Sequence, residues 1–146
     1  MTSRNFLLGG VVAGIVYFLL GWLTYGLLLK DLMDGHTSQG MLAIRRADED
    51  FILWSMIIGN LGLGFLVSYV MSKSNAVTAM SGLITGSLVG FFCSVAFDFI
   101  TYAQLNIGDM TGIWLDIATM TVVSGIAGGV TGFILSLAKR PVAAQG

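Results

Sequence analysis

Three residues that could do chemistry inside a membrane stand within apolar stretches of the sequence: Asn60, Asp98 and Asp116. Amide and carboxyl groups are costly in a bilayer, so they face a cavity, an ion pathway or a partner helix. Asn60 comes about nine residues after Phe51, or roughly 13 Å along a helix, and so lies near the middle of its stretch. We expect its amide to hydrogen-bond a neighbouring helix. The alternative is a contact with a ligand or an ion.

The two aspartates stand near the ends of their apolar stretches. Asp98 follows the turn at 72–75 by about 22 residues, roughly 33 Å of helix, which brings it to the membrane interface. Asp116 has a similar depth in its own stretch. We expect both to be solvated helix ends. The alternative is a cation-attracting mouth, in which they pair with Arg45 or Arg46.

The segment at 30–50 contains Asp31, Asp34 and the single histidine, His36. Carboxylate and imidazole groups can hold a divalent metal, but no second histidine or cysteine supports this group, and we expect no metal site. No Ser-His-Asp, Cys-His or paired-carboxylate arrangement is placed for catalysis, so we expect neither enzyme activity nor a cofactor. A net charge of −1 without a basic cluster argues against a nucleic-acid partner.

Composition indicates a membrane protein. Hydrophobic residues make up 55% of the 146 residues and charged residues 10%, whereas soluble domains have about 45–50% and about 25%. Stretches of 18 or more apolar residues can cross a bilayer as helices. The sequence therefore predicts an all-α fold, a four-helix transmembrane bundle in a single domain over 1–146. Its outer loop is at 30–50, and its spans are at about 6–29, 51–71, 77–97 and 113–138.

The charges predict an orientation for this bundle. Alternate threading places Arg4, Lys73, Lys139 and Arg140 on one side, which carries no carboxylate. Lys and Arg near helix ends mark the cytoplasmic side, so both termini are predicted to be cytoplasmic. The other side collects all the acidic residues: Asp31, Asp34, Asp48, Glu49, Asp50, Asp98, Asp109 and Asp116.

Small residues recur every fourth position along the predicted helices. In a bilayer, helices associate where small residues let their backbones approach, so these positions are candidate contact faces. The sequence alone leaves open whether the faces meet within one chain or between subunits. The clearest of them are Gly82, Gly86 and Gly90 in the third helix and Gly128 and Gly132 in the fourth.

A faint internal repeat indicates two tandem helical hairpins. The pair Gly10 and Gly14 in the first helix has the spacing of Gly82 and Gly86 in the third. The segments 64–68 and 132–136, Gly-Phe-Leu-Val-Ser and Gly-Phe-Ile-Leu-Ser, match in the same way. Both hairpins start on one side, so a duplication would be a parallel repeat about an axis normal to the membrane, with chance similarity as the alternative.

Aromatic side chains gather at the outer ends of the predicted helices, where tryptophan and tyrosine favour the membrane–water interface. We expect them to form an interfacial belt of Trp22, Tyr25, Trp54, Tyr102 and Trp114.

The start of the chain, Asn5 followed by an apolar run into Gly-Trp-Leu-Thr-Tyr-Gly at 21–26, resembles an uncharacterised family of small bacterial four-helix membrane proteins. The resemblance implies four helices in a bacterial inner membrane but no activity. We predict helix-mediated association, as a homo-oligomer or an accessory subunit of a larger membrane complex, with the lipid bilayer and other membrane subunits as partners. The alternative is a small channel or transporter for a cation or small solute, with Asn60 as a midplane contact and Asp98 and Asp116 as its mouth.

Overall fold

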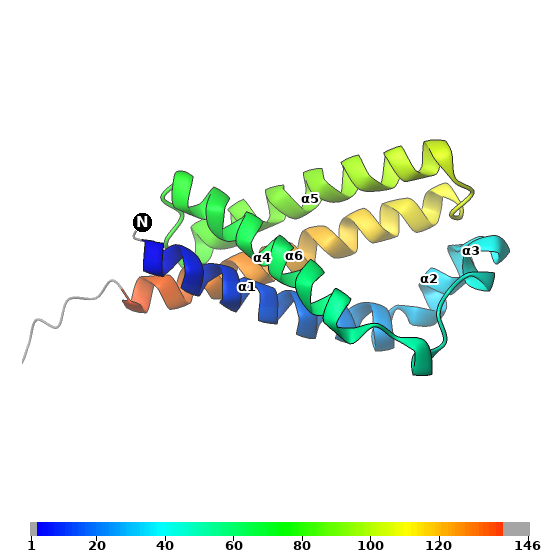
Figure 1. Ribbon diagram of the computed structural model, residues 1–146. Helices are drawn as coiled ribbons and strands as arrows, with labels where there is room; N and C mark the ends of the chain where they lie inside the picture. Colours follow the sequence, from blue (N-terminus) through cyan, green and yellow to red (C-terminus); the bar gives the residue numbers. More distant parts are fainter. Residues whose placement is uncertain (1–2, 139–146) are drawn as a thin grey trace, which may run out of the picture.

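The computed structural model describes residues 3–138, and within that range its regular structure is helical apart from one isolated β-bridge (Figure 1). The predicted all-α fold is confirmed. Four helical segments are long and apolar enough to cross a membrane. They are α1 (Ser3–Leu23) continued by the π-helical turn η1 (Thr24–Leu28), α4 (Leu53–Lys73), α5 (Ala79–Gln104) and α6 (Met110–Ala138).

Short helical segments connect α1 to α4: α2 (Lys30–His36), α3 (Gln39–Ala43) and the 3₁₀ turn η2 (Asp48–Asp50). They lie at one end of the molecule together with the α5–α6 turn. The start of α1, the α4–α5 turn and the end of α6 lie at the opposite end (Figure 1). The expected alternate threading is therefore present. Lys139 and Arg140, which contribute to the predicted orientation, lie outside the described residues.

Local signals explain where the second hairpin begins and turns. Thr78 caps α5 by accepting a hydrogen bond from the Ser81 backbone N–H, and the Ser81 hydroxyl oxygen in turn accepts one from the Thr78 backbone N–H, which completes a capping box. The carboxylate of Asp109 accepts a hydrogen bond from the Gly112 N–H at 2.9 Å and starts α6. α5 runs to Gln104, beyond the expected end at 97, because one carboxylate does not interrupt its backbone hydrogen bonds.

The helices pack most closely in two pairs, α1 with α4 and α5 with α6, and α1 also contacts α6. Along the second pair the backbones touch. A Cβ atom at Gly82 would meet the Gly128 carbonyl oxygen, and one at Gly86 would meet that of Ser124. Gly132 makes the same kind of approach to Thr78. These glycines therefore face one another within a single chain.

The first pair uses an equivalent contact. A Cβ atom at Gly64 of α4 would meet the backbone of Gly10 and Gly14 of α1. In the second pair, a Cβ atom placed on Gly132 of α6 would lie 3.4 Å from the Cα atom of Gly82. Gly64 thus lies between Gly10 and Gly14, whereas its match in the sequence repeat, Gly132, lies one helical turn away from the equivalent place. Gly128 is the residue that lies between Gly82 and Gly86.

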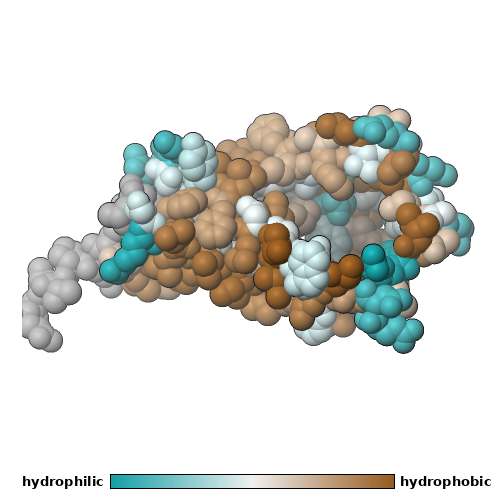
Figure 2. Space-filling model, viewed as in Figure 1, coloured by the Kyte–Doolittle hydropathy of each residue, from teal (hydrophilic) through white to brown (hydrophobic). Residues whose placement is uncertain are grey.

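The outside of the bundle is apolar. Hydrophobic side chains cover the body of the molecule and hydrophilic ones gather towards its ends (Figure 2). Large side chains such as Leu19, Ile58 and Phe97 are more than half exposed, whereas the buried core is small. Such a surface suits a hydrocarbon environment better than water.

Candidate functional site

Asp98 is a buried carboxyl group at the end of the α5 contact face. The buried residues of α5 recur every fourth position from Gly82, and Asp98 is the last of them, with 7% of its surface exposed. Its Oδ2 atom is enclosed and has no hydrogen-bond partner within residues 3–138. The expectation of a solvated helix end is wrong for Asp98, because α5 continues to Gln104 and α6 covers this face.

Asp116 of α6 brings a second carboxyl group to the same place. It is half-buried, and its carboxyl group is close enough to that of Asp98 for the two to interact directly. Both line a cavity of about 350 Å³, together with Tyr25, Thr101 and Arg45. We call this the acidic cavity. Figure 2 shows the surface hollowed towards this end of the molecule.

The two carboxyl groups have no basic partner among the described residues. Arg45 lines the acidic cavity, but its Nη1 atom binds the Asp34 carboxylate at 2.7 Å. Arg46 lines a different cavity. The alternative in which the aspartates pair with Arg45 or Arg46 is therefore wrong as to those partners. Three carboxyl groups line the acidic cavity, those of Asp98, Asp109 and Asp116. Asp109 contacts His36 and Arg45 binds Asp34, which leaves Asp98 and Asp116 without a basic partner among the described residues.

The connecting segment closes the acidic cavity at the end of the bundle. The Ser38 N–H donates to the Ile107 carbonyl at 3.0 Å, and the Asp109 N–H donates to that of His36 at 3.1 Å. The His36 ring also contacts Asp109, with 2.9 Å between Nδ1 and Oδ2. Hydrogen bonds from His36 and from the Gly112 N–H lower the pKa of the exposed Asp109 carboxyl group. The loop is thus fixed to the α5–α6 turn.

Among residues 3–138 no three His, Cys, Asp or Glu side chains gather as a metal-binding group. The cluster that the sequence offered is divided between separate contacts. Asp34 binds Arg45, and His36 binds Asp109.

Tyr25 is a site residue that the sequence did not reveal. It stands in the π-helical turn, where the Leu29 N–H donates to the Thr24 carbonyl at 2.7 Å, five residues back. Its hydroxyl group is buried without a hydrogen-bond partner that meets normal geometry in the described part of the chain, and the Asp116 carboxyl group is its neighbour. Tyr25 stands at the outer end of its helix, as expected, but its hydroxyl group is enclosed, whereas the side chains of Trp22, Trp54, Trp114 and Tyr102 are exposed. Single π-helical turns are often found at functional sites.

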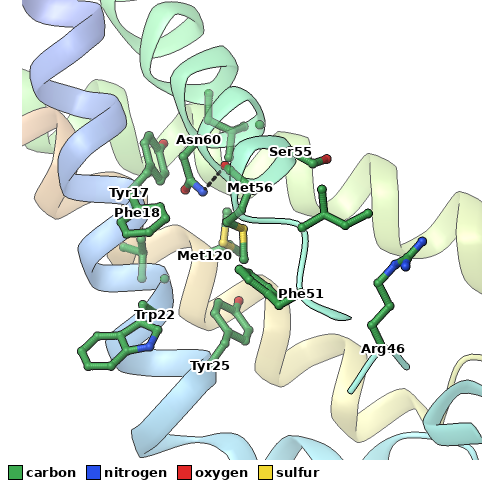
Figure 3. A pocket seen from close by; sticks show the side chains of 15 residues that line it. Tyr17, Phe18, Trp22, Tyr25, Arg46, Phe51, Ser55, Met56, Asn60 and Met120 are labelled. Atoms are coloured by element: carbon green, nitrogen blue, oxygen red, sulfur yellow. Dashed lines mark hydrogen bonds between the residues drawn. The ribbon is translucent and has the colours of Figure 1, made fainter. Parts of the chain in front are cut away.

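A second and larger cavity, of about 630 Å³, lies between α1, α4 and α6. Figure 3 shows rings of α1 facing the start of α4 across it. We call it the aromatic cavity, and its labelled side chains are Tyr17, Phe18, Trp22 and Tyr25 of α1 and η1, Arg46, Phe51, Ser55, Met56 and Asn60 around the start of α4, and Met120 of α6.

Asn60 lines the aromatic cavity without joining two helices. Its side-chain amide donates to the Met56 carbonyl at 2.8 Å, one turn earlier in α4 (Figure 3). The expected interhelical hydrogen bond is therefore wrong. The backbone of Asn60 lies close to Gly14 of α1, but its side chain bonds within α4 and lines the cavity. Asn60 and the aspartate pair belong to different cavities, and Tyr25 lines both.

Comparisons with protein-family models, with curated proteins and with solved structures found no match for this chain.

Proposed function

We propose that this chain is a small integral membrane protein that binds and transports a cationic solute at Asp98 and Asp116. The observation that carries the proposal is the buried, unpartnered carboxyl oxygen of Asp98 beside a second carboxyl group in a cavity. Two neighbouring carboxylates repel in surroundings of low polarity, so the pair requires a positive charge. A proton or a bound cation can supply it.

The apolar helices and the charge distribution support the membrane setting of this site. We place the spans across a bacterial inner membrane with both termini cytoplasmic, following the rule for Lys and Arg. The acidic cavity then lies near the outer surface. Carboxylates gathered at that end raise the local concentration of cations and steer them towards the cavity.

A carrier fits this geometry better than an open pore. Beyond Asp98, towards the opposite end, α5 and α6 are in backbone contact at Gly90, Gly86 and Gly82. A cation bound at Asp98 therefore cannot continue between these helices without a change of conformation. Transporters that work by alternating access move one group of helices against another around a fixed site.

The test is cation uptake by the purified protein in liposomes, with Na⁺, K⁺ and ammonium as probes. We expect saturable uptake of at least one probe, and its loss in Asp98→Asn and in Asp116→Asn. Asp48→Asn is the matched control, because this exposed carboxylate lies outside both cavities. Absence of uptake and of binding for every probe, or equal uptake by Asp98→Asn, would overturn the proposal.

Helix-mediated association is the second candidate function, and the free face of α4 favours it. The close contacts of α5 and α6 at Gly82, Gly86 and Gly128 are used within the chain, but a Cβ atom at Gly62, which lines neither cavity, would meet nothing within 4 Å. We propose that homo-oligomers, or complexes with another membrane subunit, form there. Native mass spectrometry of wild type and Gly62→Leu tests this. A monomeric wild type without a partner would contradict it.

A further inference from the structure

The acidic and aromatic cavities lie along one face of α6. Asp116 lines the first, and Met120 and Val123 line the second, so the lining residues recur at intervals of three to four positions. From Gly112 to Val123 the two cavities follow roughly 16 Å of helix at 1.5 Å per residue. Tyr25 belongs to both linings. A ligand longer than an inorganic ion can therefore occupy the two cavities together.

The chemistry of the two linings differs in a way that suits one class of ligand. Aromatic ring faces attract cations and also bury apolar groups. Tyr17, Phe18, Trp22 and Phe51 supply such faces in the aromatic cavity, whose volume is in the range of small-molecule sites. Arg46 stands at its margin, apart from these rings (Figure 3). The aromatic cavity has no carboxylate in its lining, so the charge is concentrated in the acidic cavity.

We infer that the transported solute is an amphiphilic organic cation, whose ammonium head binds Asp98 and Asp116 and whose apolar body extends past Tyr25 into the aromatic cavity. This inference rests on the proposed function and names its substrate class. An inorganic cation would use the acidic cavity alone. An apolar neutral molecule would leave a proton as the source of the positive charge that the carboxyl pair requires.

Tyr25 is positioned to contact both the ammonium head and the apolar body of the ligand. Its hydroxyl group is buried beside Asp116, and its ring lines the aromatic cavity. An ammonium group bound at the aspartates can donate a further hydrogen bond to the Tyr25 hydroxyl oxygen. The Tyr25 ring then covers the first carbons of the ligand's apolar body. Tyr25→Phe keeps the ring and removes the acceptor, so it should weaken the binding of all the ammonium ligands by a similar factor.

The test is calorimetric binding to the purified protein of ethylammonium, butylammonium, hexylammonium and phenethylammonium, with empty micelles as background. 2-Phenylethanol is the neutral counterpart of phenethylammonium. We expect affinity to rise by about three- to fourfold for each methylene, because each buried methylene contributes about 0.8 kcal/mol. We expect Asp98→Asn to lose at least tenfold at every chain length, and 2-phenylethanol to bind far more weakly than phenethylammonium.

Two phenylalanines allow a matched pair of variants that tests where the apolar body of the ligand binds. Phe51 lines the aromatic cavity and is 52% exposed, whereas Phe133 is 54% exposed and lines neither cavity. Phe51→Ala should reduce the gain per methylene, and Phe133→Ala should leave it unchanged. Both side chains are largely exposed, so neither change threatens the fold.

The outcomes separate this inference from the proposed function. If ethylammonium and its longer relatives all bind equally, and Phe51→Ala matches Phe133→Ala, the substrate class is wrong while a cation site remains. If no ammonium ligand binds, or Asp98→Asn binds them as wild type does, the cation site itself is wrong. Binding of 2-phenylethanol as tightly as phenethylammonium would also overturn the inference.

Discussion

Replacing Gly86 by alanine gives a direct test of the packing between α5 and α6. A Cβ atom there would meet the Ser124 carbonyl oxygen at a separation that real Cβ atoms do not show, and the Gly128 Cα atom at 3.1 Å. Both contacts are with backbone, which cannot rotate away as a side chain can. The variant can fold only if α5 moves away from α6.

The size of this effect follows from the displacement. A gap on the order of 1 Å forfeits up to about half of the dispersion energy of the contacts along it, and overpacked cores usually lose about 1–3 kcal/mol. The neighbouring glycines Gly82 and Gly90 share the contact, so the upper part of that range applies. We therefore expect Gly86→Ala to lower the free energy of unfolding by about 2–3 kcal/mol.

Gly62→Ala is the matched control. Gly62 also lies inside a long helix, but a Cβ atom there would meet nothing within 4 Å. Alanine is a better helix former than glycine by up to about 1 kcal/mol, so this change should be neutral or stabilising. The two alanine variants should then differ by about 3 kcal/mol, or roughly 100-fold in the folding equilibrium.

The assay is reversible unfolding in mixed micelles of a mild detergent and dodecyl sulfate, followed by circular dichroism. Gly86→Leu and Leu88→Phe extend the comparison, because Leu88 is 53% exposed and can enlarge into the surrounding detergent. Gly86→Leu should be the less stable of the two. Equal stability of Gly86→Ala and Gly62→Ala would refute the close backbone contact.

Three further predictions concern the ends of the molecule and Asn60. Because hydrogen bonds lower the pKa of Asp109, its stabilising contribution is present above the ordinary value of 3.8 and is lost as the pH falls through the lowered value. The melting temperature should thus fall more steeply below pH 4 in wild type than in Asp109→Asn, and parallel curves would contradict this. Asn60→Ala should cost less than about 1 kcal/mol in the same unfolding assay, because only a bond within α4 is lost; a larger loss would indicate an interhelical role. With Cys93 replaced by serine, an impermeant thiol reagent on intact cells should label Gln39→Cys and not Ser74→Cys, and the reverse result would invert the orientation.

The fold was largely predictable because span length and glycine spacing are local properties of a membrane chain. Stretches of 18 or more apolar residues identify the helices, and a spacing of four identifies a face. What such a face meets is a tertiary property. The spacing of Gly82 and Gly86 is equally compatible with contacts between subunits. Only the structure shows that Gly128 and Ser124 of the same chain lie opposite these glycines.

The candidate site was less predictable, for reasons that differ from residue to residue. The depth of Asp98 was judged from the thickness of a bilayer, which does not show that α6 covers that side of α5. Tyr25 turns inwards through a π-helical turn, which no propensity of its segment indicates. The partner of His36 is 73 residues away, so no local pattern could name Asp109.

The two hairpins resemble one another in packing but differ in chemistry, and this difference locates the site. Gly26 stands as far after Gly10 as Asp98 stands after Gly82, so the first hairpin has a glycine where the second has its buried carboxyl group. That glycine follows Tyr25 directly, and a Cβ atom there would be in ordinary contact with the Trp22 ring. The second hairpin therefore supplies the charge and the first supplies the aromatic rings. A site divided in this way responds to any movement of one hairpin against the other, which is the motion that a carrier requires.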